Sequence, residues 1–175
     1  MAKKIIFIIP QKDFRDEEYF ISKEVLESNG IKVVTASNER KIALGADGGE
    51  VPVDIEIKDI KIEDYEGLIF IGGPGSLTYL NNQQSHNLAI EAFKQGKIVG
   101  AICISPIILS EAGLLNGKKA TVWSDSLNKE PIRLLQESGA EYLKEDIVVD
   151  GKIITANGPD SAKEFGQAIY ELTFS

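Results

Sequence analysis

The 175-residue sequence contains one cysteine, Cys103, and one histidine, His86. A single cysteine cannot form an intrachain disulfide, and one cysteine with one histidine cannot build a Cys/His zinc cluster. Disulfide-rich secreted scaffolds and zinc fingers are therefore excluded. An enzyme of the Ser-His-Asp or Cys-His type would have to use His86, because the chain has no other imidazole. We expect neither a metal ion nor another cofactor.

Positive charge and long hydrophobic runs are also scarce. The 19 Lys and Arg residues are outnumbered by 27 Asp and Glu residues, for a net charge of −8, which would repel phosphate backbones and anionic headgroups. No stretch approaches the ~18 apolar residues of a membrane helix. The apolar run at residues 5–9 stops at Pro10, short of the ~7–15 residues of a signal-peptide core. We expect a soluble cytoplasmic protein that binds neither nucleic acid nor membranes.

Short apolar runs alternate with helical patterns along the whole chain. Continuous apolar runs of this length are typical of strands buried on both faces, as in a parallel sheet. Their alternation with helices predicts βαβ units in a single domain, residues 1–175, with a sheet covered on both faces. The predicted strands are 5–9, 31–35, 68–71, 98–102, 120–123 and 153–156, and the predicted helices are 14–29, 85–95, 105–112, 128–138 and 161–172.

Turn and capping residues mark the ends of these elements. Asp13 is placed to cap the first helix and Gly30 to end it, and a glycine follows four of the helices. Residues 42–57 predict a hairpin or an edge strand. Residues 147–154 predict a hairpin around the pair Asp150-Gly151.

Cys103 lies where a predicted buried strand meets a predicted helix. Strand 98–102 runs directly into it, and Pro106, a residue favoured in the first helical turn, follows. Ligands of open α/β sheets bind beyond the carboxyl ends of the strands, and a sharp strand-to-helix turn exposes a nucleophile there. The start of a helix would also favour the thiolate. An inert buried cysteine is the alternative that position alone leaves equally open.

Gly72 and Gly73 directly follow the predicted strand 68–71. Glycines at a strand end allow backbone N–H groups to approach a bound oxyanion closely. The Walker pattern of a phosphate loop is absent from this segment. An ordinary glycine turn is the alternative.

Glu18 falls on the predicted inward face of the first helix. A carboxyl on this face would be partly desolvated, which favours its protonated form and would allow it to donate a hydrogen bond to a thiolate. A charged side chain at the rim of the apolar stripe explains the pattern equally well. Asp16, Glu17 and Glu24 are expected in solvent, and so is His86, in a polar helix start. The apolar residues of the stripe are Phe14, Ile21 and Val25.

Together these segments resemble the DJ-1/PfpI superfamily, which comprises PfpI-like intracellular proteases and the parkinsonism-associated deglycase. The family's Ala-Ile-Cys-X-X-Pro elbow is matched by residues 101–106, its glycine loop by 71–73 and its Asp-X-Glu helix start by 16–18. Residues 149–155, 158–159 and 164–165 resemble its terminal hairpin and helix. The resemblance covers nearly the whole chain. It implies a flavodoxin-like three-layer α/β sandwich of the class I glutamine amidotransferase-like type, with a mostly parallel central sheet, helices on both faces and a nucleophile elbow.

The resemblance also implies roles for individual residues. Protease-type members carry His directly after the nucleophile, where this chain has Ile104, and relatives place His or Tyr at the position of Trp123. A Cys-His peptidase mechanism therefore lacks its base. The implied set is Cys103 as nucleophile with Glu18 hydrogen-bonded to it, an oxyanion site of backbone groups from Gly72, Gly73 and Ile104, and pocket walls from Trp123, Pro74 and Ser105.

These roles favour a cysteine-dependent glyoxalase or deglycase-like hydrolase, acting on small aldehydes such as methylglyoxal or on their adducts. One alternative is a redox-sensing or chaperone-like stress protein that uses oxidation of Cys103. The other is an intracellular cysteine peptidase, which Ile104 disfavours. The resemblance further implies a homodimer or a higher homo-oligomer.

Overall fold

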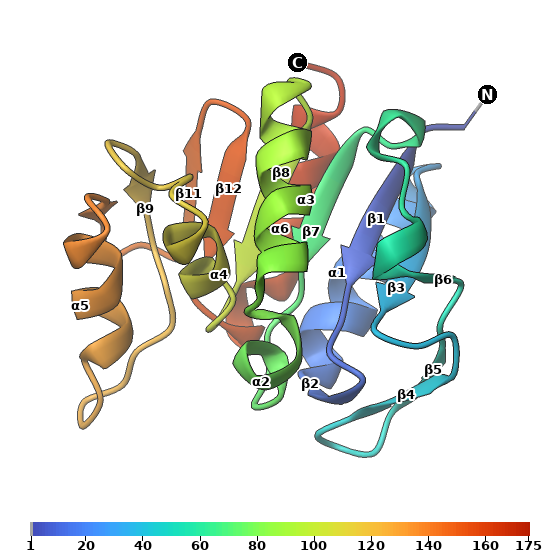
Figure 1. Cartoon of the computed structure of the whole chain (residues 1–175), viewed down its shortest axis with the longest axis horizontal. Helices are drawn as coiled ribbons and strands as arrows, with labels where there is room; N and C mark the ends of the chain where they lie inside the picture. Colours follow the sequence, from blue (N-terminus) through green and yellow to red (C-terminus); the bar gives the residue numbers. More distant parts are fainter. Residues whose placement is uncertain (1) are drawn as a thin grey trace.

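The computed structural model describes residues 2–175 and has a seven-stranded sheet at its centre (Figure 1). Strands β1 (Lys4–Ile8), β3 (Lys32–Ser37), β7 (Gly67–Phe70), β8 (Ile98–Ile102) and β12 (Ile153–Ala156) are parallel, in the spatial order β12-β8-β7-β1-β3. Counted along the chain these five give the order 2-1-3-4-5 of flavodoxin-like folds. The edges are β6 (Ile55–Glu56), parallel to β3, and β11 (Ile147–Asp150), antiparallel to β12.

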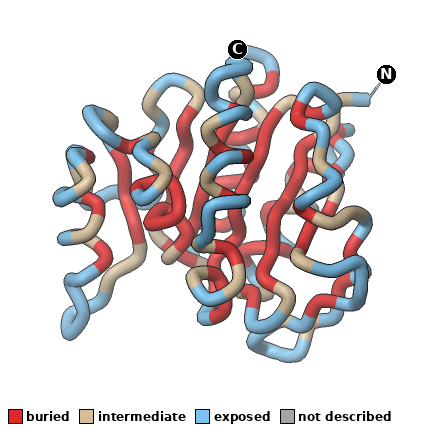
Figure 2. Tube along the Cα trace, in the orientation of Figure 1, coloured by how far each residue is buried: buried red, intermediate tan, exposed pale blue. Residues whose placement is uncertain are grey.

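Helices cover both faces of this sheet and make three layers. Helices α1 (Asp16–Ser28) and α6 (Ala162–Leu172) pack together on one face, and α3 (Gln83–Lys94), α4 (Pro106–Glu111) and α5 (Glu130–Glu137) cover the other. Successive β1 side chains alternate between the two cores, because neighbouring residues of a strand point to opposite faces. Figure 2 shows the central strands buried, with exposed residues on the outer sides of the helices. The predicted fold class is confirmed.

Both predicted hairpins are present. Strands β4 (Ile42–Gly45) and β5 (Glu50–Pro52) are antiparallel and form a separate three-stranded sheet with β2 (Lys12–Phe14), while β6 provides the edge strand. In the second hairpin, Asp150 pairs with Ile153, so the two-residue connection is Gly151-Lys152. The predicted turn pair Asp150-Gly151 was therefore one residue early.

The predicted strand at residues 120–123 is wrong as part of the main sheet. Only β9 (Lys119–Ala120) is a strand, and it pairs with β10 (Glu141–Tyr142) in a sheet of two strands. The edge of β8 is already occupied by β12. The Thr121 N–H consequently donates to the Thr155 hydroxyl, 2.9 Å away, instead of to a ladder carbonyl.

The start of the first helix also differs from the prediction. Helix α1 begins at Asp16 after Arg15, which makes no side-chain cap, and Asp13 instead lies in β2 with a φ of 62°. Gly30 ends the helix region as predicted, with a φ of 81°. The buried face of α1 is not the predicted stripe, since Ile21 is 37% exposed. Its members are Glu18, Tyr19, Ser22 and Leu26.

The remaining short helical segments are α2 (Ser76–Leu80), η1 (Ile57–Asp59), η2 (Ile62–Asp64) and η3 (Pro159–Ser161). Within residues 2–175, no helix combines the length and the apolar character needed to cross a membrane.

Candidate active site

The candidate site lies at the carboxyl ends of three adjacent strands. Cys103 follows β8, Gly72 follows β7, and Glu18 is in the helix that comes after β1 and β2. Because β7 lies between β1 and β8 in the sheet, these segments meet at one edge. The chain reverses its direction of strand addition between β1 and β7, and such switch points form the ligand crevice of open α/β sheets.

Cys103 has a left-handed backbone, with a φ of 64°. A residue with a side chain pays about 1–2 kcal/mol for this conformation, so the surroundings must hold it. Its N–H donates to the Ala156 carbonyl at 2.9 Å, and its carbonyl accepts from the Trp123 N–H at 2.8 Å. The predicted nucleophile elbow is therefore present and anchored on both sides, with Cys103 only 7% exposed.

Glu18 is completely buried beside the cysteine. Its Oε1 accepts a hydrogen bond from the Gly72 N–H at 3.0 Å, and its carboxyl interacts with the Cys103 thiol. A Cβ on Gly72 would lie 2.5 Å from Glu18 Oε1 and 2.6 Å from the Cys103 Cβ. Only glycine therefore allows the carboxyl and the cysteine to approach this closely.

Burial dominates the ionisation of both side chains. Desolvation raises the pKa of Glu18 from 4.5 to about 8, although its interaction with the Cys103 side chain and the hydrogen bond from the Gly72 N–H lower it. Desolvation also raises the pKa of the Cys103 thiol, and the negative charge of Glu18 raises it further. The predicted thiolate at the helix start is thus wrong for the resting state, because the Ile104 N–H and Arg15 only partly oppose these effects. Near neutral pH the pair holds both protons, and it releases the first near pH 8.

The backbone donors around Cys103 differ in what they already bind. The N–H of Gly72 is occupied by Glu18, which corrects its expected place in an oxyanion site. The Gly73 N–H has no acceptor among the hydrogen bonds of residues 2–175, and the Ile104 N–H interacts with the Cys103 sulfur. Gly73 and Ile104 are therefore the donors in position to receive a developing negative charge.

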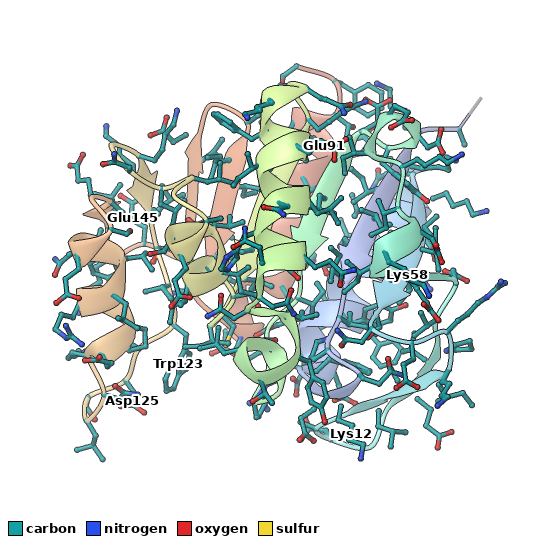
Figure 3. The ribbon with its side chains drawn as sticks, in the orientation of Figure 1. Lys12, Lys58, Glu91, Trp123, Asp125 and Glu145 are labelled. Carbon is teal, nitrogen blue, oxygen red and sulfur yellow. The ribbon has the colours of Figure 1, made fainter. Side chains whose placement is uncertain are left out.

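A cavity of about 260 Å³ opens above the cysteine. Pro74, Trp123 and Ile104 lie in its wall, and Figure 3 shows Trp123 at the lower end of the molecule, where the parallel strands end. Ser105 does not line it, because its buried hydroxyl donates to the Ile71 carbonyl at 2.8 Å. The lining consists of Arg15, Gly73, Pro74, Leu77, Cys103, Ile104, Trp123 and Pro159.

Three lining residues were not predicted from the sequence: Arg15, Leu77 and Pro159. Arg15 was detectable in principle, because it lies three residues before Glu18 at the start of the same helix and residues three apart share a helical face. Leu77 and Pro159 come from segments that follow β7 and β12, and only the folded sheet brings them to the cavity.

His86 is not one of the residues that line the cavity. It lies in α3, half-buried, and its Nε2 is hydrogen-bonded to Asn81 at 2.8 Å. Asp16 is likewise not a freely solvated charge, because its carboxylate accepts from the N–H groups of Asp47 and Gly49 in the β4–β5 turn. In residues 2–175, no three His, Cys, Asp or Glu side chains are grouped to hold a metal ion.

Comparisons with known proteins show which family this chain resembles. Residues 3–172 match the model of the DJ-1/PfpI family. An uncharacterised protein of Methanocaldococcus jannaschii is 43% identical over 93% of this chain and 78% of its own length. A glutathione-independent glyoxalase of Caenorhabditis elegans is 27% identical over 97% of this chain and 88% of its own. Deglycase PfpI of Pyrococcus furiosus is 29% identical over 89% and 90% of the two chains. The crystal structure of a ThiJ/PfpI domain protein from Brachyspira murdochii superimposes with a TM-score of 0.92, at 29% identity, over 98% of this chain and 96% of that one.

Proposed function

The chain belongs to the DJ-1/PfpI family, and from this membership and the geometry of the site we propose that it is a cysteine-dependent enzyme that converts small 2-oxoaldehydes such as methylglyoxal to 2-hydroxy acids. Cys103 is the nucleophile and Glu18 moves the protons. Relatives named glyoxalase and deglycase support this class of substrate.

The observation that carries the proposal is the buried contact between Glu18 and Cys103. A carboxyl whose pKa is raised to about 8 gives up and takes back a proton near physiological pH, as a general acid or base must. Once the pair has lost one proton, the remaining proton is held between the carboxyl and the sulfur. The pair then contains a nucleophile and an acid at the same time.

The reaction balances without an oxidant or a reductant. Sγ bonds to the aldehyde carbon C1, and the carbonyl oxygen takes the proton of Glu18, giving a hemithioacetal. The Glu18 carboxylate then removes the hydrogen of C1 as a proton and returns it to C2, while the C1 hydroxyl proton ends on the C2 oxygen. C1 is thereby oxidised to a thioester and C2 reduced. Water cleaves the C1–S bond and releases lactate from methylglyoxal.

The cavity favours this substrate class over peptides. Its volume of about 260 Å³ is below the ~300–1,000 Å³ of drug-sized ligand sites. Its wall beside the sulfur is apolar, with Ile104 and Trp123 where a peptidase of this family would need an imidazole. His86 lies in α3, and its ring is hydrogen-bonded to the Asn81 side chain. A compact aldehyde therefore suits the site.

The test is lactate production from methylglyoxal by the purified protein. We expect Cys103→Ala to abolish it and Glu18→Gln to lower kcat by a factor of about 10²–10⁴, while His86→Gln leaves both kcat and KM unchanged. Turnover by Cys103→Ala equal to that of the wild type would refute the proposal. Failure to consume any aldehyde, combined with added oxygen mass on Cys103 at low peroxide, would replace it with redox sensing.

A further inference from the structure

Arg15 contributes a positive charge to the wall of the cavity that the proposed chemistry does not use. We infer that its guanidinium binds a carboxylate, so that the preferred substrates are 2-oxoaldehydes that also carry a negatively charged carboxylate group. This inference rests on the proposed function, and it names the substrate class of the same site.

The first observation is that the guanidinium has donors to spare. Its Nε is buried without a hydrogen-bond partner within residues 2–175. Guanidinium groups present five N–H donors in a fixed fork, and a buried donor without a partner is unfavourable. The Arg15 side chain is 31% exposed and lines the cavity, so a carboxylate there can pair with the accessible edge of this fork in bidentate fashion.

The second observation is the position of Arg15 relative to the nucleophile. Arg15 and Cys103 line the same cavity, and the charge of Arg15 acts on the ionisation of both Cys103 and Glu18. The backbone N–H of Arg15 donates to the Gly72 carbonyl at 2.9 Å. This bond connects the start of α1 to the loop that carries the free Gly73 N–H. A ligand can therefore reach the sulfur with its aldehyde and Arg15 with its other end.

Asp47 is the acidic group that competes for this arginine, and it does so weakly. Its Oδ2 is 3.8 Å from Arg15 Nη1, beyond hydrogen-bond distance, and the two side chains are 53% and 31% exposed. Exposed pairs of this kind contribute little, because water screens them. The backbone N–H of Asp47 donates to Asp16 in the β4–β5 turn, and Asp47 is not among the residues that line the cavity.

The apolar remainder of the wall explains why the charge would select a substrate. Apart from Arg15 and Cys103, the lining is made of Gly73 and five apolar side chains, Pro74, Leu77, Ile104, Trp123 and Pro159. An ion pair in such surroundings is stronger than in water. An uncharged oxoaldehyde would leave the guanidinium without a counter-charge in the cavity, whereas an anionic one would supply it.

Two alkylating reagents of nearly equal size test the anion site without relying on turnover. Iodoacetate carries a carboxylate and iodoacetamide does not, and both react with the thiolate. Relative to a free cysteine peptide, we expect the wild-type protein to favour iodoacetate, and we expect Arg15→Gln to lose about tenfold of this preference. Arg15→Lys should retain part of it. Lys12→Gln removes the same charge from an exposed position in β2 (Figure 3), outside the cavity lining, and should keep the wild-type preference.

A matched pair of substrates tests the consequence for catalysis. 4,5-Dioxopentanoate is anionic and yields 2-hydroxyglutarate, and 2-oxopentanal has a methyl group in place of the carboxylate. The ratio of their kcat/KM values should fall about tenfold in Arg15→Gln with the rate on 2-oxopentanal maintained. An equal loss on both substrates, or an unchanged iodoacetate preference, overturns the inference and leaves the proposed function standing. No turnover of either aldehyde by the wild type, with an Arg15-dependent preference for iodoacetate, overturns the proposed function and supports the anion site.

Discussion

Replacing Glu18 with Gln should change how the stability of the protein depends on pH. In the folded protein Glu18 is fully buried, and desolvation raises its pKa from 4.5 to about 8. Between these values the unfolded chain releases a proton that the folded protein keeps. The contribution of Glu18 to stability is therefore fully present below pH 4.5 and is lost as the pH rises toward 8. Gln has the shape of the protonated carboxyl, can accept the Gly72 N–H, and carries no charge.

The size of the effect follows from the shift in pKa. A rise from 4.5 to about 8 corresponds to roughly 5 kcal/mol when both states have titrated completely, at about 1.36 kcal/mol per unit. At pH 5 the carboxyl of the unfolded chain is already more than half titrated, and at pH 8 that of the folded protein is half titrated. The loss of stability between pH 5 and pH 8 is therefore about 3–4 kcal/mol in the wild type, and Glu18→Gln should not show it.

Urea unfolding at pH 5, 6, 7 and 8 measures this difference, with far-UV circular dichroism and the fluorescence of Trp123, the one tryptophan, as probes. The free energy of unfolding of Glu18→Gln minus that of the wild type should grow by about 3–4 kcal/mol across the series, or by roughly 6–16 °C in Tm for a chain of this size. Glu24→Gln, at an exposed position further along α1, controls for the loss of a carboxylate from this helix. Parallel pH profiles for wild type and Glu18→Gln would show that Glu18 titrates normally and would refute the reasoning.

Two backbone predictions follow from the same geometry. Gly72→Ala places a Cβ 2.5 Å from Glu18 Oε1 and 2.7 Å from the Ile102 carbonyl oxygen. Chemical denaturation should therefore show a loss of about 1–3 kcal/mol in the free energy of unfolding, and kcat/KM for methylglyoxal should fall about 100-fold. Wild-type values of both would contradict this packing. At the left-handed position, Cys103→Gly should be more stable than Cys103→Ala by about 0.5–1 kcal/mol, whereas Ala168→Gly inside α6 should cost about 1 kcal/mol. A lower Tm for Cys103→Gly than for Cys103→Ala would indicate that the backbone is not strained.

The fold was largely predictable because the central strands carry their own signal. The runs that became β1, β7 and β8 are apolar on every residue or nearly so, which only a sheet covered on both faces requires. The glycines that follow the helices indicated where each helix ends. The segment at residues 120–123 is also mostly apolar, yet only Ala120 of it lies in a strand, β9 (Lys119–Ala120). This segment did not join the main sheet because β12, which comes later in the chain, pairs with the edge of β8.

The candidate site was predictable in part, and for different reasons at each residue. Cys103 was located by the junction between strand and helix, a local property. Glu18 was correctly expected on an inward face, but with the wrong neighbours, since α1 buries Tyr19 and Leu26 and leaves Ile21 exposed. The role of Gly72 depended on a hydrogen bond to a residue 54 positions away, which no local pattern contains.

Under the proposed function, the geometry also explains how the site would act without an imidazole. A Cys-His pair is effective because the pKa of histidine lies near the working pH, so that the same group accepts and returns a proton. An ordinary carboxyl, with a pKa of ~4.3, is too weak a base for this task. Complete burial raises the pKa of Glu18 to about 8, which places a carboxyl in the range that histidine usually occupies. The stability lost on ionising Glu18 and its ability to exchange protons near neutral pH thus have one physical cause, and a change that lets water reach the carboxyl should restore stability at alkaline pH while removing the proton transfer.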